Sequence, residues 1–150
     1  MKALARWVAS VAGAGLLRPA PGTFGSAAAL LPGLLLLWAS PWALAAGLVV
    51  AVAAGLWAIP AAGVRGDPGW VVIDELAGQW VALLALASPS LLGAVLAFAL
   101  FRAFDIFKPG PIGWAERLPG AVGVMADDLL GGLAAAILLA GLRWAAPGLL

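Results

Sequence analysis

Charged side chains are absent from long stretches of this chain, and that distribution limits the folds open to it. The run at 43–63 has no charged residue. As a helix it would extend roughly 30 Å, the thickness of a bilayer core. Only 10% of the 150 residues are charged and 65% are hydrophobic, whereas roughly 25% are charged in an ordinary soluble domain. A small soluble domain cannot bury so much apolar surface, because its ratio of interior to surface is low. The sequence therefore predicts a membrane protein.

Pro, Gly and charged residues divide the chain into apolar runs, and these runs indicate the number of helices. The runs cover 26–39, 43–63, 71–87, 91–107 and 129–146. Within the first run, Pro32-Gly33 predicts a break, and the residues at 88–90, Ser-Pro-Ser, are typical of a turn. Whether 71–87 crosses the membrane fully stays open.

The N-terminal segment 3–17 is mostly apolar and has two basic residues, Lys2 and Arg6, at or near its start, as a signal peptide would. It lacks a convincing cleavage site at its end, so we predict a retained, short or interfacial helix. We expect a single membrane-embedded domain over 1–150. Its predicted fold is all-α, a small polytopic membrane helical bundle of about four to five hydrophobic helices plus a short N-terminal helix.

Apart from Arg143, which approaches the other side, the charged residues after the N-terminal segment form three clusters, and helical hairpins separate one cluster from the next. The clusters are Arg18; Arg65, Asp67, Asp74 and Glu75; and Arg102, Asp105, Lys108, Glu116, Arg117, Asp127 and Asp128. Each hairpin returns the chain to the side that it left, so all three clusters face one side of the membrane. Most of the basic residues lie on that side, and the positive-inside rule then predicts that it is cytoplasmic. We expect a multi-pass membrane protein whose polar site faces the cytoplasm.

Residue types that the chain lacks exclude several kinds of chemistry. There is no Cys, His or Tyr, and Thr23 is the only threonine. Thiol nucleophiles, Ser-His-Asp hydrolases and histidine-ligated metals are therefore excluded. A net charge of +1 provides no broad basic face, so we expect no nucleic-acid partner. The oligomeric state stays open.

Two pairs of adjacent acids stand where apolar runs begin. Asp74-Glu75 leads into the third run, and Asp127-Asp128 precedes the fifth. The helix dipole stabilises acidic side chains in the first turn of a helix, and this purely structural role is the alternative explanation for both pairs. An ionised side chain at mid-bilayer costs about 2.5–3.5 kcal/mol. Acidic residues in a membrane protein therefore favour a functional interpretation over a structural one. An oxygen-only donor set without His or Cys points to Mg²⁺.

Arg102, Asp105 and Lys108 recur every three residues and share one helix face, which ends at Pro109. Two cations beside a carboxylate suit a phosphate and a metal held side by side. The alternative is a local salt-bridge ladder on the helix surface. The stretch 21–26, Pro-Gly-Thr-Phe-Gly-Ser, opens the first long helix, where backbone amides can approach an anion. Its alternative is an ordinary helix cap by Thr23 or Ser26.

These pieces, in this order and spacing, resemble the phosphatidylglycerophosphatase A family over roughly residues 19–135. The resemblance rests on P-G-T-x-G-S at 21–26, D-E-x₂-G-x-W at 74–80, F-R-x-F-D-x₂-K-P-x-P-I at 101–112 and G-x-M-x-D-D at 123–128. It implies an all-α inner-membrane enzyme that removes the terminal phosphate of phosphatidylglycerophosphate, with Mg²⁺ as cofactor, to give phosphatidylglycerol. Departures from the usual family pattern are Gly110, Gly113, Glu116 and Ala121, and none of them is a proposed ligand.

The resemblance also implies roles for individual residues. It assigns metal binding to Asp74, Glu75, Asp105, Asp127 and Asp128, and catalytic acid–base work to Glu75, Asp105, Asp127 and Asp128. It places Thr23, Ser26, Arg102 and Lys108 at the substrate phosphate. The nucleophile is a water molecule, an Asp that forms an acyl-phosphate, or Thr23, and we favour water. The alternatives in function are a phosphatase for another membrane lipid phosphate and a small ion-coupled transporter.

Overall fold

The computed structural model describes residues 1–146 and is helical throughout, without a strand in that range. Its α-helices are α1 (Lys2–Ala9), α2 (Pro21–Ala39), α3 (Pro41–Ala61), α4 (Ile73–Leu83), α5 (Leu91–Phe107), α6 (Pro111–Ala115) and α7 (Gly120–Ala145), with a 3₁₀ turn η1 (Ala14–Leu16) after α1. The predicted all-α class is confirmed. The last four residues of the predicted domain lie outside the described range.

Three of these helices, α2, α3 and α7, are long and apolar enough to cross a membrane. This confirms the predicted small membrane bundle. Helix α4 has 11 residues and extends roughly 16 Å, too short to cross a bilayer core by itself. The run at 71–87 therefore forms a short helix inside the bundle.

The first long helix differs from the sequence prediction, because α2 passes through Pro32-Gly33 without a break. Proline is tolerated in membrane helices, where neighbouring helices compensate for the lost hydrogen bond. Gly33 serves packing: a Cβ added to it would lie 2.7 Å from Trp80 Nε1. The small residue lets α4 approach α2 closely.

The predicted short N-terminal helix is confirmed, although it covers only the first part of the segment 3–17. Helix α1 ends at Ala9, and Val11, Ala12 and Gly13 have positive φ angles of 48°, 55° and 94°. These left-handed conformations reverse the chain before η1. The segment thus folds as a short helix and a turn, which pack on α3 and α2 respectively.

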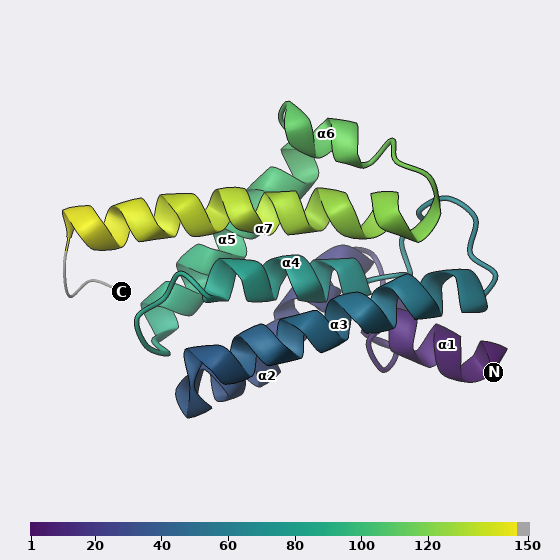
Figure 1. The fold of residues 1–150 in the computed structure, drawn as a ribbon, viewed down its shortest axis with the longest axis horizontal. Helices are drawn as coiled ribbons and strands as arrows, with labels where there is room; N and C mark the ends of the chain where they lie inside the picture. The colour runs from purple at the N-terminus through teal and green to yellow at the C-terminus, as the bar shows by residue number, and fades with distance from the viewer. Residues whose placement is uncertain (147–150) are drawn as a thin grey trace.

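Helix α4 occupies the centre of the bundle and packs against α2, α3, α5 and α7 (Figure 1). A Cβ on Gly132 of α7 would overlap the carbonyl oxygen of Gly78 in α4, so the two helices touch through their backbones. Toward α2, the Trp80 Nε1–H donates a 2.9 Å hydrogen bond to the carbonyl oxygen of Ala29. These contacts fix the depth and rotation of α4.

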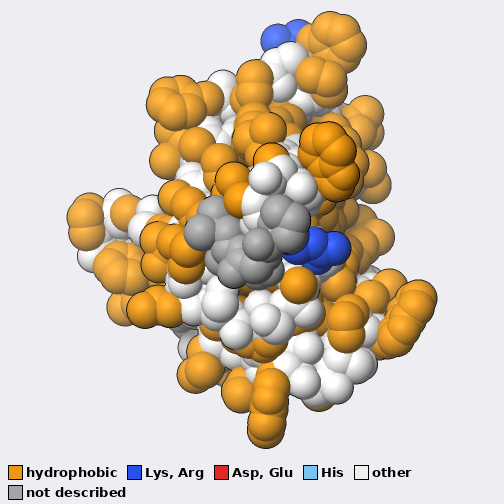
Figure 2. Space-filling view, turned by 90° about the vertical axis from the view of Figure 1, so that its left-hand side faces the viewer, with side chains coloured by type: hydrophobic (Ala, Val, Ile, Leu, Met, Phe, Trp, Pro, Cys, Tyr) orange, Lys and Arg blue, Asp and Glu red, His pale blue; other side chains and the backbone are white. Residues whose placement is uncertain are grey.

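The two ends of the bundle differ in polarity. The α2–α3 and α4–α5 connections lie at the end where α7 finishes (left in Figure 1), whereas the N-terminus and the starts of α4 and α7 lie at the other. Seen from the first end, the visible surface is mostly hydrophobic, and no acidic side chain appears on it (Figure 2). Polar side chains can therefore gather near the starts of α4 and α7.

Candidate active site

Three carboxylates from two helices converge at the polar end of the bundle. Asp74 and Glu75 come from the first turn of α4, and Asp128 comes from α7. One oxygen of each lies within 4.8 Å of the others, and Asp74 and Asp128 are only 4% and 3% exposed. Asp128 is the ninth residue of α7, so the capping alternative for the 127–128 pair is wrong.

This carboxylate trio (Asp74, Glu75 and Asp128) is short of positive partners. Asp74 Oδ1 and Glu75 Oε2 are buried without a hydrogen-bond partner among the described residues. Burial raises the pKa of Asp74 well above its usual value, and the neighbouring carboxyls raise it further. Burial likewise raises the pKa of Glu75, to about 7. Unpartnered buried oxygens in this spacing fit a hard divalent cation such as Mg²⁺, whose preferred protein ligands are carboxylates.

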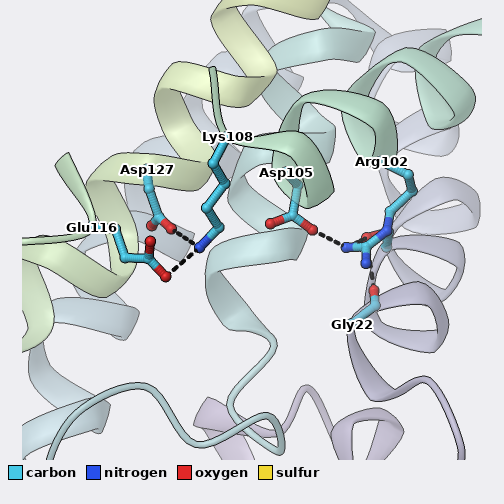
Figure 3. Close-up of polar contacts among 7 residues, drawn as sticks. Gly22, Arg102, Asp105, Lys108, Glu116 and Asp127 are labelled. Carbon is cyan, nitrogen blue, oxygen red and sulfur yellow. Dashed lines mark hydrogen bonds and ion pairs between the residues drawn. The ribbon is translucent and has the colours of Figure 1, made fainter. Parts of the chain in front are cut away.

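Arg102 joins α5 to the start of α2 (Figure 3). Its Nη1 forms an ion pair with Asp105 Oδ2 and donates to Ser26 Oγ at 3.4 Å. Ser26 Oγ in turn donates a 2.8 Å hydrogen bond to the carbonyl oxygen of Gly22. The buried Arg102 Nε has no partner among the described residues. Asp105 therefore orients a guanidinium that keeps a free donor.

Lys108 forms the second cationic group, at the end of α5. It caps the helix in the left-handed region, with φ 43° and ψ 54°, and the chain turns there. Its Nζ donates hydrogen bonds of 2.6 Å to Asp127 Oδ2 and 2.8 Å to Glu116 Oε1 (Figure 3). Burial opposes the charge, but these two acids outweigh it and hold the pKa of Lys108 above its usual value. Lys108 therefore stays cationic at neutral pH.

At Gly22 the start of α2 lies close to Glu75 of the trio and to Arg102. A Cβ at this position would overlap Glu75 Oε1 and would lie 3.2 Å from Arg102 Nη1 and 3.3 Å from Arg102 Nη2. A side chain at this position would therefore displace the Glu75 carboxylate. Thr23 follows in the same helical turn and is half-buried, with no side-chain hydrogen bond to any described residue.

In the structure the acids predicted from the sequence fall into two groups, which their spacing along the chain did not distinguish. Asp74, Glu75 and Asp128 form the trio, whereas Asp105 and Asp127 each face a cation. Ser26 touches Arg102, which is consistent with its predicted place at the phosphate.

Sequence reasoning missed Gln79, which lies one turn after Glu75 in α4. Its side chain is fully buried, and neither its amide nitrogen nor its amide oxygen has a hydrogen-bond partner among residues 1–146. An unpaired buried amide is costly. The available signal was a glutamine inside the otherwise apolar stretch at 76–87.

This arrangement places the carboxylate trio, which could hold a cation, beside an oriented arginine and a lysine. Such a site can hold a phosphate group whose charge is neutralised from several sides, and it can stabilise charge that develops during phosphoryl transfer. Because the chain has no His or Cys, oxygen and nitrogen groups of this site must do the chemistry.

Comparisons with known proteins agree with this chemistry. A family model described as "Phosphatidylglycerophosphatase A" matches residues 7–143. A Bacteroides thetaiotaomicron protein named "Putative phosphatidylinositol-3-phosphatase" is 40% identical over 141 residues, covering 88% of this chain and 89% of that protein. Proteins named "Phosphatidylglycerophosphatase A" are 37% identical in Haemophilus influenzae (88% of this chain, 84% of that protein) and 35% identical in Escherichia coli (85% and 76%). No solved structure matches the chain.

Proposed function

The chain belongs to the phosphatidylglycerophosphatase A family, and from this premise we propose that it hydrolyses phosphatidylglycerophosphate to phosphatidylglycerol and inorganic phosphate. The family identifies it as a phosphatase, and the carboxylate trio beside Arg102 supports a phosphomonoester as the group attacked. In the cell this reaction would complete the synthesis of phosphatidylglycerol.

Mg²⁺ is the proposed cofactor, held by Asp74, Glu75 and Asp128. The support is the spacing of their oxygens and the two buried oxygens without a partner. When bound, the ion would supply positive charge to phosphate oxygens and lower the barrier to attack at phosphorus. Asp105 and Asp127, which face cations, act beside the ion in this proposal.

The remaining polar side chains of the site bind the substrate phosphate in this proposal. The free Nε–H of Arg102 donates to a phosphoryl oxygen, while Asp105 and Ser26 hold the guanidinium in place. Lys108, oriented by Asp127, adds a second positive charge. Thr23, which follows Gly22 in the first turn of α2, contributes its hydroxyl in this proposal.

The nucleophile in this proposal is water. Asp127 Oδ1, which is buried, unpartnered and outside the trio, accepts a proton as the water oxygen attacks phosphorus. The bond between phosphorus and the glycerol oxygen breaks, and the leaving oxygen takes up a proton from solvent, to which the carboxyl group later returns the proton that it accepted. An acyl-phosphate on an Asp is the competing path, and acid-quench trapping of a phosphoenzyme would reveal it.

We place the protein in the inner membrane with this site at the cytoplasmic surface. Three apolar helices support membrane residence. Most basic residues lie near the site, whereas Arg143, at the far end of α7, donates to the carbonyl oxygen of Ala85 in the α4–α5 connection. The positive-inside rule supports the orientation.

Phosphate release from phosphatidylglycerophosphate by the purified protein in detergent micelles tests the proposal. We expect turnover with Mg²⁺, none with EDTA, and recovery when Mg²⁺ is restored. No release by the folded protein at any Mg²⁺ concentration would refute the activity, and undiminished release in EDTA would refute the cofactor.

A phosphoinositide monophosphate is a second candidate substrate, because the Bacteroides thetaiotaomicron relative carries that activity in its name. Both lipids present a phosphomonoester at the membrane surface, so the same trio and cations would serve. A panel of lipid phosphates in the same assay, compared by kcat/KM, would distinguish them.

A further inference from the structure

A cavity of about 570 Å³ lies between the N-terminal segment and the starts of α2 and α4. Arg6 and Arg18 line it together with the apolar side chains of Leu16, Pro21 and Trp70. Among the described residues, no carboxylate lines it. The cavity thus contains two positive charges and no negative one, which favours an anion with an apolar attachment.

Both arginines are available to a ligand. The guanidinium carbon of Arg6 lies 5.0 Å from the centroid of the Trp70 ring, and this cation–π contact orients the group while leaving its edge donors free. Neither Arg6 nor Arg18 forms an ion pair with any acid in residues 1–146. Oriented, unpaired guanidinium groups match the oxygens of a phosphate.

The cavity adjoins the candidate active site along two elements. Pro21 lines the cavity, and the next residue, Gly22, contacts Glu75 and Arg102. Trp70 likewise lines the cavity and lies four residues before Asp74. A ligand that fills the cavity would therefore have one end beside the carboxylate trio.

We propose that Arg6 and Arg18 bind the phosphodiester of the lipid substrate while its terminal phosphomonoester lies at the active site. This inference rests on the proposed function, because phosphatidylglycerophosphate carries two phosphates joined by a three-carbon glycerol. Leu16, which lines the cavity, has an exposed side chain that can contact the apolar part of the lipid. The pair of arginines then selects lipids that carry a diester as well as a monoester.

The double variant Arg6→Gln/Arg18→Gln tests this selectivity in micelles of neutral detergent. We expect KM for phosphatidylglycerophosphate to rise at least tenfold with kcat within twofold of wild type. For phosphatidate, which has a monoester and no diester, we expect KM to change less than twofold. The control Lys2→Gln/Arg65→Gln removes the same charge outside the cavity and should leave both KM values unchanged. Equal increases for both substrates would mean general attraction to anionic lipid, and no increase for either would mean no role. Both results would overturn the proposal.

Calorimetric binding of dihexanoyl phosphatidylglycerol separates this site from catalysis, since that lipid keeps the diester and lacks the monoester. We expect the double variant to bind it at least tenfold more weakly than wild type. Equal affinity would overturn the proposal even if the variant hydrolysed poorly. A wild-type protein that binds this lipid but releases no phosphate from phosphatidylglycerophosphate would refute the proposed function and leave the diester site standing.

Discussion

Replacing Gly22 by alanine adds one methyl group at the point where α2 meets the site. The new Cβ would overlap Glu75 Oε1 and lie 3.2 Å from Arg102 Nη1. To restore an ordinary contact, the Glu75 carboxylate must move by on the order of 1 Å, and a misplacement of that size can lower turnover about 100-fold. In free energy this corresponds to roughly 2.7 kcal/mol on the barrier.

The free energy of unfolding of the Gly22→Ala variant should rise slightly or stay unchanged. Gly22 is the second residue of α2, and the preference for alanine over glycine, up to about 1 kcal/mol in a helix interior, is an upper bound for this first-turn position. We therefore expect Gly22→Ala to keep its melting temperature in detergent while losing most of its phosphate release. The Mg²⁺ concentration for half-maximal activity should also rise, because Glu75 is a proposed ligand.

Gly141→Ala is the matched control, since a Cβ at position 141 of α7 meets nothing within 4 Å. It should keep full activity and the wild-type Mg²⁺ requirement. Wild-type turnover in Gly22→Ala would refute the placement of Glu75 and Arg102 against α2. Equal losses in Gly22→Ala and Gly141→Ala would refute the argument from contact.

Asp127→Asn should lower turnover at least 100-fold with normal membrane insertion. Glu116→Gln removes the other acidic partner of Lys108, which is 47% exposed, and should change turnover less than threefold, because exposed ion pairs contribute about 0–1 kcal/mol. Similar losses of turnover in both variants would contradict the ranking of the two acids by burial. Trp80→Phe removes the 2.9 Å bond to α2 and should lower stability by about 1 kcal/mol, read as a lower melting temperature with kcat retained. Gly132→Ala places a Cβ against the backbone of Gly78 and should destabilise the bundle by about 1–3 kcal/mol, and an unchanged melting temperature would show that α4 and α7 do not touch there.

The one-sided arrangement of the charges could be predicted because it depends only on counting hairpins. Apolar length gives α2, α3 and α7 as spans, and the acids and bases then meet at one end. The boundaries of α3 and α5 were predicted within a few residues, because Pro41 and the Pro109 turn mark them in the sequence. Helix α6 was not predicted, since its five residues lie among prolines and glycines.

The sequence could not predict which acids form the trio and which face a cation, because this depends on how α4 and α7 are rotated about their axes. Adjacent acids such as Asp127 and Asp128 point in different directions on a helix, and the sequence does not say which direction faces α4. The backbone contact between Gly78 and Gly132 sets that rotation. As a result Asp128 joins the trio and Asp127 faces Lys108.

The charge balance of the site supports the proposed need for a cation. Five of its carboxyl groups are buried or half-buried, and the cations within the site are Arg102 and Lys108. The start of α4 favours the negative charge of Asp74 and Glu75 through the helix dipole, but this contributes only about 0.3–1 kcal/mol. Burial of unpaired carboxylates opposes folding by considerably more. Asp74 and Asp128 are only 4% and 3% exposed, so bulk water solvates their carboxylates poorly. A bound divalent cation would offset most of the excess negative charge, and the phosphate of the substrate would then meet a site close to neutral.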